Sequence, residues 1–317
     1  MSNSSGLVEG LTPAQKETLD LIRVPQEDRT IFPSSLRAEL HHRLEKETVK
    51  VADALPSDLW VAKRQLQAVN SCELLYMAQK QEEFRYSVPT SRGQIFHKAV
   101  ELSVHLPSIL SPSELVGHAF NSLSARDDSL SHFLNESDSV TAAEIRSECV
   151  SLLSTFQETF PPLRSAWRPT TEASRRVSFH RDKIILAGRF DLTLGMPTDR
   201  TAGRVIIELK TGKPSIQHAD DLRYYALLET LVTGVPPVLL ASFYVDAGRV
   251  VTENVDEVLL ESTLRRTITG VKRLCSLRLE DVQPKKLPGP PCRWCPVSDE
   301  CAEGSDWLKE STETNGW

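Results

Sequence analysis

Hydrophobic residues recur at helical spacing through the first half of the chain. This pattern predicts a short helix at 12–22, followed by helices at 34–55, 57–81, 90–106, 111–123 and 141–160. Thr12 is in position to cap the first of these helices, and Pro56 separates the second from the third. The pair Pro161-Pro162 ends the helical half, so we expect a different kind of structure after it.

The second half changes to alternating and β-branched positions, which are typical of strands. We expect strands at 175–180, 183–195 and 204–212, a helix at 217–234, a hairpin at 237–255 and a long helix at 256–280. A Pro-rich and Cys-rich tail follows. The order of a helical region and then β-β-α-β-β-α predicts an α/β fold.

The strand at 204–212 contains two charged residues within an apolar run, "VIIELK". Glu208 and Lys210 share one face of that strand because side chains alternate between its faces. Asp191 is a similar acid within the preceding apolar strand, and a hairpin would bring it near Glu208. One alternative is an edge strand whose Glu208 and Lys210 face water. The other is a Mg²⁺ or Mn²⁺ site, because two close carboxylates repel each other unless a cation lies between them.

The two stretches "GRFD" (188–191) and "ELKTG" (208–212) resemble the core motif of the PD-(D/E)xK nuclease superfamily. The resemblance implies a restriction-endonuclease-like fold, with a mixed central sheet flanked by helices. It also implies that Asp191, Glu208 and Lys210 are catalytic and that the reaction is metal-dependent hydrolysis of phosphodiester bonds. Lys210 would orient the attacking water.

Further residues resemble the RecB-like branch of this superfamily. "GQIFHKAVE" places His97 on a predicted helix upstream of the strands. The resemblance implies that His97, Asp191, Glu208 and the carbonyl of Leu209 hold the metal. Without the resemblance, a single His on an amphipathic helix is more often an ordinary side chain.

The helix after the lysine strand matches the branch only in part. Tyr225 fits the tyrosine of its Q-x-x-x-Y pattern, which implies a catalytic role, but Asp221 stands where the branch has Gln. Gln217 lies one turn too early to replace it. An acid at this position could weaken contact with DNA or change the metal preference. Tyr224 and Tyr225 could equally pack against the sheet.

Three cysteines lie close together in the tail segment "PCRWCPVSDEC", at 292, 295 and 301. Thiolates at this spacing indicate a metal site, which requires a fourth ligand. Cys149 and Cys275 lie in helical patterns and are typical of buried small residues, which leaves Cys72. The set of Cys72, Cys292, Cys295 and Cys301 resembles that of RecB-like nucleases with a [4Fe–4S] cluster; Zn²⁺ is the alternative.

Composition and charge set the remaining expectations. Of the 317 residues, 40% are hydrophobic and 25% are charged, and the net charge is −6. Residues 162–213 nevertheless hold eleven Lys or Arg against five Asp or Glu, which permits a phosphate-binding surface. No secretory signal or membrane span is visible, so we expect a cytoplasmic protein. We expect an N-terminal helical extension (1–60), a nuclease domain (61–305) with a helical insert at about 105–162, and a tail (306–317).

The expected function is that of a metal-dependent deoxyribonuclease, with single-stranded DNA or DNA ends as substrate. DNA repair or recombination and defence against foreign DNA are the two settings that the resemblance implies, with a helicase or a CRISPR-type protein as partner. The first alternative is a catalytically weak DNA-end-binding or assembly subunit. The second is a phosphodiesterase that acts on RNA or nucleotides.

Overall fold

The computed structural model describes residues 10–81, 84–106, 110–126, 128–215, 217–280 and 282–314. Six strands form one mixed sheet: β1 (Leu59–Val61), β2 (Thr170–Phe179), β3 (Ile184–Leu194), β4 (Val205–Lys210), β5 (Leu239–Tyr244) and β6 (Arg249–Asn254). The order β1-β3-β4-β5-β6 leaves β2 to pair with β3 along its other edge. β4 is therefore an interior strand, antiparallel to β3 and parallel to β5.

One edge of strand β3 pairs with β1 near the start of β3 and with β4 near its end. β1 pairs with residues 184–186 of β3, and β4 pairs with residues 192–194. Residues 187–191 therefore have no strand partner on this edge, while β2 continues to pair along the other. Groups other than a strand can therefore bind the backbone in this gap, and the carbonyl of Ala187 accepts the hydroxyl of Tyr224 at 3.1 Å.

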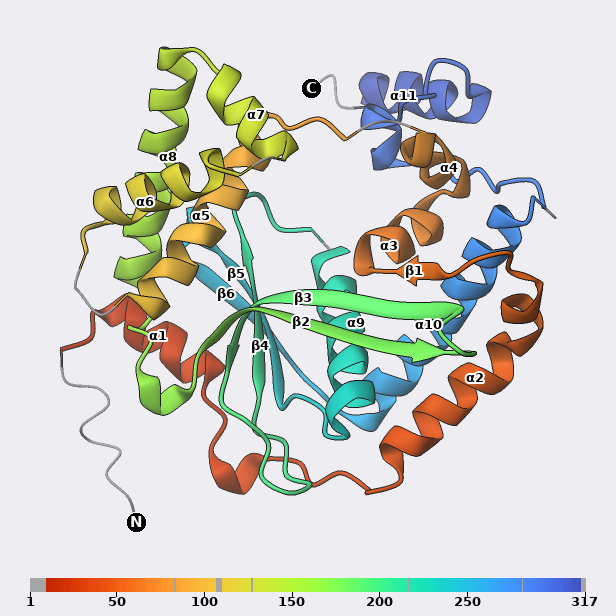
Figure 1. Cartoon of the computed structure of the whole chain (residues 1–317), viewed down its shortest axis with the longest axis horizontal. Helices are drawn as coiled ribbons and strands as arrows, with labels where there is room; N and C mark the ends of the chain where they lie inside the picture. Colours follow the sequence, from red (N-terminus) through yellow and green to blue (C-terminus); the bar gives the residue numbers. More distant parts are fainter. Residues whose placement is uncertain are drawn as a thin grey trace.

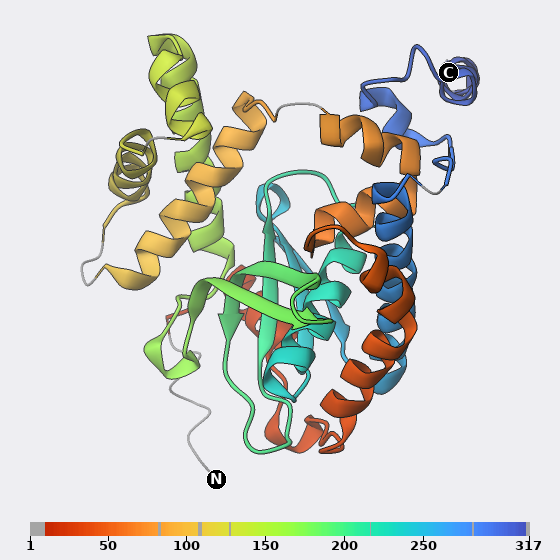
Figure 2. The same ribbon diagram turned by 45° about the vertical axis from the view of Figure 1, so that its right-hand side comes forward.

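The first half of the chain supplies eight α-helices in its described part. They are α1 (Pro13–Ile22), α2 (Leu36–Ala54), α3 (Lys63–Ser71), α4 (Glu73–Gln81), α5 (Val88–His105), α6 (Pro112–Ser124), α7 (Ser129–Glu136) and α8 (Ser139–Thr159). Figures 1 and 2 show α5, α6, α7 and α8 gathered on one side of the sheet and α3 and α4 on the other. Two helical groups thus flank the strands that carry the charged residues.

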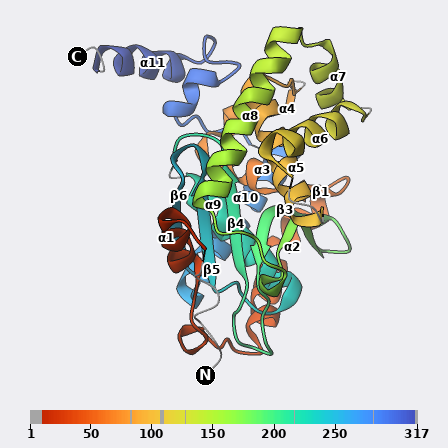
Figure 3. The same cartoon turned by 90° about the vertical axis from the view of Figure 1, so that its left-hand side faces the viewer.

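Helices cover both faces of the sheet. On one face α9 (Gln217–Thr233) packs against β2, β3, β4 and β5, and α10 (Glu257–Arg278) packs against α9 and α2. On the other face, rings of α5 and α8 meet β5 through the aromatic cluster of Phe96, Phe156, Phe160 and Phe243. Figure 3 shows α1 beside α8 and the edge of the sheet. Burial of these apolar surfaces is the main stabilising contribution.

Most predicted elements are confirmed, including the α/β order, the cap of α1 and the hairpin of β5 and β6. The side chain of Thr12 accepts a hydrogen bond from the backbone N–H of Gln15, as a helix cap does. The prediction of a single helix at 57–81 is wrong, because residues 59–61 form β1 and the helix is broken at Cys72. "LWV" is a short β-prone run, and the open edge of β3 gives it backbone partners.

Two of the helices, α7 and α11 (Ala302–Thr314), were not predicted from the sequence. α11 crosses the expected boundary at 305, and the division of the chain into three parts stays a prediction. None of the helices described has the length and apolar character that crossing a lipid bilayer requires.

Candidate active site

Glu208 lies in the interior of the protein on β4, with only 4% of its surface exposed. The edge-strand alternative is therefore wrong. One carboxylate oxygen, Oε1, accepts hydrogen bonds from Nζ of Lys63 and, at 2.9 Å, from Nζ of Lys210. Burial raises the pKa of Glu208, but the two ammonium groups outweigh burial and hold the pKa below its usual value. Glu208 is thus a charged carboxylate within the core.

The gap along β3 brings Asp191 to the backbone of β4. The pairing of β3 with β4 stops at Leu192 and Ile207, so the backbone of Leu209 has no strand partner on that side. The N–H of Leu209 donates instead to Oδ2 of Asp191, at 2.8 Å. Its carbonyl oxygen lies 3.1 Å from Nε2 of His97, which comes from α5. The predicted residues His97, Asp191 and Leu209 therefore do meet.

Glu172, which sequence reasoning missed, completes this group. The pairing of β2 with β3 places Glu172 opposite Asp191, and the ladder is interrupted there. Its φ of 52° is in the left-handed region, which a non-glycine residue seldom occupies within a strand. Ligand atoms of His97, Glu172 and Asp191 all lie within 4.8 Å of one another. The two like charges are stable side by side only with a positive charge between them.

The imidazole of His97 provides positive charge in this structure. Its Nδ1 lies 3.4 Å from Asp191 and 3.8 Å from Glu172. Burial lowers the pKa of His97, but the two carboxylates outweigh burial and raise it to about 10. Burial likewise raises the pKa of Glu172, while His97 and Arg189 hold it below its usual value. The group thus attracts a cation.

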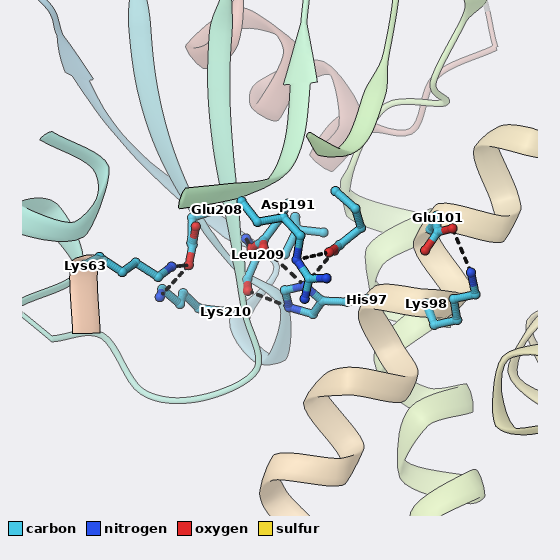
Figure 4. Close-up of polar contacts among 10 residues, drawn as sticks. Lys63, His97, Lys98, Glu101, Asp191, Glu208, Leu209 and Lys210 are labelled. Carbon is cyan, nitrogen blue, oxygen red and sulfur yellow. Dashed lines mark hydrogen bonds and ion pairs between the residues drawn. The ribbon is translucent and has the colours of Figure 1, made fainter. Parts of the chain in front are cut away.

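The chemistry of the group fits a divalent cation. Glu208 lies beside the group of His97, Glu172 and Asp191 but outside the 4.8 Å within which their ligand atoms meet, and its second carboxylate oxygen, Oε2, is buried and has no hydrogen-bond partner. A buried carboxylate oxygen without a partner is costly, and a cation would satisfy it. Carboxylates, a carbonyl and one imidazole are ligands that suit Mn²⁺ or Mg²⁺. Figure 4 shows His97 approaching β4 from one side and Lys63 from the other.

The comparisons with known proteins agree with this geometry. A family model of the PD-(D/E)XK nuclease superfamily matches residues 62–302. The chain belongs to the PD-(D/E)XK nuclease superfamily. The match includes β2 to β6 and all the side chains of the site, and it begins one residue after the end of β1.

Similarity to solved structures is distant. A "putative exonuclease" from Eubacterium rectale has 9% sequence identity and a TM-score of 0.42, with 81% of this chain and 90% of that chain covered. The protein SSO0001 has 13% identity and a TM-score of 0.32, with coverage of 84% and 96%. No curated protein matches the sequence. Likenesses at this level do not indicate a substrate.

Sterics explain why the first position of the superfamily motif "GRFD", residue 188, is a glycine. A Cβ on Gly188 would lie 2.7 Å from the Cε1 atom of Tyr225, which is too close for any side chain. The ring of Tyr225 also packs 4.7 Å from the ring of Phe190 and beneath Nζ of Lys63. Both Tyr225 and Tyr224 are buried, as the packing alternative expected. The catalytic role of Tyr225 stays a prediction.

Asp221, which replaces the usual Gln, is also directed at the site. Its Oδ2 lies 3.6 Å from Nζ of Lys210. Burial raises the pKa of Asp221, and Lys63 and Lys210 only partly offset this effect. Gln217 instead pairs with Gln67 at 2.6 Å. Lys210 therefore has two carboxylate neighbours on this face, Glu208 and Asp221.

The four predicted cysteines surround one small cavity, of about 20 Å³, at the junction of α3, α4 and the tail. They are Cys72, Cys292, Cys295 and Cys301, and all are free thiols. A side chain on Gly304 would lie 3.5 Å from the sulfurs of Cys292 and Cys301, so the glycine keeps this space open. Cys149 and Cys275 are buried elsewhere, and burial raises their pKa values to about 12 and about 11.

A separate contact fastens the tail next to these cysteines. The buried carboxylate of Glu73 pairs with Arg273 on α10 and accepts the backbone N–H of Lys285 at 2.8 Å. The N–H of Glu73 in turn donates to the carbonyl of Lys285 at 3.1 Å. We call this set of contacts the Glu73 clamp. It joins α4, α10 and the start of the tail without any metal.

Proposed function

We propose that this protein is a metal-dependent deoxyribonuclease of the RecB-like branch that hydrolyses phosphodiester bonds at single-stranded DNA or DNA ends. The observation that carries the proposal is the meeting of His97, Glu172 and Asp191 beside the charged pair of Glu208 and Lys210. Superfamily membership supports the reaction type. The preference for single-stranded ends rests on resemblance to the branch.

His97, Glu172, Asp191, the unpaired oxygen of Glu208 and the carbonyl of Leu209 would hold the cation. A bound Mg²⁺ or Mn²⁺ stabilises negative charge on a phosphate and lowers the pKa of water. The imidazole among oxygen ligands favours Mn²⁺ over Mg²⁺, because Mg²⁺ prefers an all-oxygen shell. We expect faster cleavage with Mn²⁺ for this reason.

Lys210 is placed to handle the attacking water. Its Nζ donates one hydrogen bond to Glu208 and retains two further donors. One of them can orient a water molecule or neutralise a phosphate oxygen. Lys63, on the other side of Glu208, holds that carboxylate in place. The two lysines therefore have different roles, since Lys63 positions Glu208 and Lys210 contacts the substrate.

We also propose that the cysteine set binds a [4Fe–4S] cluster with a structural role. Zn²⁺ would hold tetrahedral thiolates about 3.8 Å apart, given Zn–S bonds of about 2.3 Å. Among the residues that the structure describes, no three cysteine sulfurs lie within 4.8 Å of one another. The sequence spacing supports a cluster instead, because one upstream cysteine joins a C-x2-C-x5-C set, whereas structural zinc sites usually repeat C-x2-C pairs.

A DNA-end-binding or assembly subunit is the second candidate, and one observation favours it. Asp221 adds a carboxylate next to Lys210, and this negative charge opposes the approach of a phosphate. The intact set of Asp191, Glu208 and Lys210 favours the enzyme.

We expect the wild-type chain, purified without oxygen, to cleave labelled single-stranded DNA when Mn²⁺ or Mg²⁺ is added. EDTA should abolish cleavage and added Mn²⁺ should restore it. An RNA strand of the same sequence should be cut more slowly; faster cutting of RNA would favour the RNA-directed alternative. A folded, cluster-loaded protein that binds DNA ends without cutting them would instead establish the second candidate function, a DNA-end-binding or assembly subunit.

The cluster proposal predicts the effect of Cys295→Ala. The purified variant should lose the brown colour of iron–sulfur absorption, because three thiolates hold a four-iron cluster poorly. Its melting temperature should fall and its tail should become sensitive to protease, because metal binding contributes to folding free energy. Cys149→Ala is the matched control and should keep the colour. If Cys295→Ala melts like the wild type, the proposed structural role is wrong.

A further inference from the structure

A groove of about 950 Å³ is lined by residues that the chemistry described so far does not use. It is lined by β1, α3, α4, the last turn of α10 and the cysteine segment of the tail. Figures 1 and 2 show these elements together on the side of the sheet opposite α6, α7 and α8. The groove therefore joins parts of the chain that are far apart in sequence.

Three large aromatic side chains line the groove and are exposed. Trp60 is 48% exposed, Phe84 is 47% exposed and Trp294 is 61% exposed. Exposure of such surface is unfavourable, and aromatic rings gathered in one hollow usually meet a ligand. They come from β1, from the segment before α5 and from between two cysteines of the tail. Only the tertiary fold therefore brings these three side chains into one groove.

Cationic side chains line the groove together with these rings. Arg64, Lys80, Arg85 and Arg278 line the same groove, against one carboxylate, that of Asp58. The guanidinium of Arg64 lies 5.5 Å from the ring centre of Phe84. Asp58 is already engaged, since its Oδ2 accepts the indole N–H of Trp60 at 2.6 Å. The groove thus combines flat apolar faces with positive charge.

This combination suits a single-stranded nucleic acid. Unpaired bases expose faces that stack on aromatic rings, while the backbone phosphates contact Arg and Lys. Bases in a duplex are stacked on one another and have no free face to offer. An apolar protein partner would bury the rings but would have no use for four cations. Charge complementarity therefore favours a strand over a protein.

Helix α3 connects the groove to the active site. Its first two residues are consecutive in sequence but serve different sites, because Lys63 contacts Glu208 while Arg64 lies over Phe84. The first turn of α3 therefore contributes one side chain to the groove and one to the site of Glu208.

We propose that the groove binds the single-stranded segment of the substrate that adjoins the cleaved bond, with bases stacked on Trp60, Phe84 and Trp294. The inference rests on the proposed function for the identity of the polymer. It adds a specific prediction, namely that strand affinity depends on aromatic faces that lie outside the metal site.

The test is binding of a fluorescein-labelled oligothymidine of about 15 nucleotides, a length within the range of such sites. Anisotropy is measured on the full, cluster-loaded chain in EDTA, so that no cleavage is required. Trp60→Leu and Trp294→Leu should each raise Kd by about 5- to 150-fold, the loss of one stacked base. Trp60→Phe and Trp294→Phe keep an aromatic face and should stay within about 3-fold of the wild type.

Charge is tested in parallel. Arg85→Ala should make the dependence of binding on salt shallower by about 0.7 in slope, which is one phosphate contact on a single strand. Arg265→Ala is the matched control, since Arg265 is an exposed arginine of α10 that pairs with Glu261 outside the groove. A blunt duplex of the same length should bind all these variants equally.

The proposal fails if both Leu variants, with melting temperatures like that of the wild type, bind the oligothymidine as tightly as the wild type. That result would favour a protein partner as the ligand of the groove. Trp60→Leu keeps the test valid if Trp294→Leu disturbs the neighbouring cysteines. Failure of the proposed nuclease function has a different signature, because the wild type would then bind the strand and never cut it.

Discussion

Lys210→Ala should lower the rate of DNA cleavage by about 10²- to 10⁴-fold, the usual contribution of a group that positions or transfers a proton. The variant should remain folded, because Glu208 keeps its bond to Lys63. Binding of oligothymidine should change little. The measurement is single-turnover cleavage with Mn²⁺, beside a thermal melt of each protein.

Lys98→Ala is the matched control for this experiment. Lys98 directly follows His97 on α5, but Figure 4 shows it directed toward Glu101, with which it pairs at 2.7 Å, and away from the site. Its removal should leave cleavage near the wild-type rate. Lys210→Ala with undiminished cleavage would show that the chemistry takes place elsewhere.

Asp191→Asn should weaken Mn²⁺ binding by at least about 100-fold and reduce cleavage at least as much, because a charged ligand is lost. Asn keeps the side-chain oxygen that accepts the N–H of Leu209, so the local backbone should be retained. The direct readout is Mn²⁺ titration followed by electron paramagnetic resonance, which requires no activity.

Two further variants complete the metal experiment, one as a control and one as a second test of the site. Asp220→Asn removes an acid of α9 that pairs with Arg223 and Arg266, outside the metal group, and should bind Mn²⁺ as the wild type does. Glu172→Gln should weaken Mn²⁺ binding although sequence reasoning gave this residue no role. Unchanged Mn²⁺ affinity in Asp191→Asn would remove the basis for the proposed site.

The sequence was informative wherever a residue violated a local pattern. Glu208 and Lys210 stood out because charges seldom occupy an apolar strand, and the hairpin fixed where Asp191 would lie. Glu172 gave no such signal, since it precedes the predicted strand at 175–180, whereas β2 begins at Thr170. Its position opposite Asp191 follows only from the register of β2 on β3, and its φ of 52° has no sequence signature.

Long-range packing accounts for the other omissions. Lys63 reaches Glu208 across 145 positions of sequence, and this contact depends on how α3 packs against α9. β1 is three residues long and sits between helical patterns, so only the open edge of β3 makes it a strand. The cysteines were identified from their spacing, but nothing in that spacing indicated that Trp294, between two of them, would line a groove.

If the cysteine set binds the proposed cluster, the Glu73 clamp determines which part of the protein unfolds first when the iron is removed. Because the clamp needs no metal, opening of the tail would begin after Lys285 and leave α4 and α10 joined. Hydrogen exchange would then rise in residues 286–314 alone, while the amides of β4 stay protected. A molecule without iron would keep its catalytic residues in place but would lose Trp294 from the lining of the groove. Oxidative damage to the proposed cluster would then weaken binding of the strand before it lowered the rate of the cleavage step.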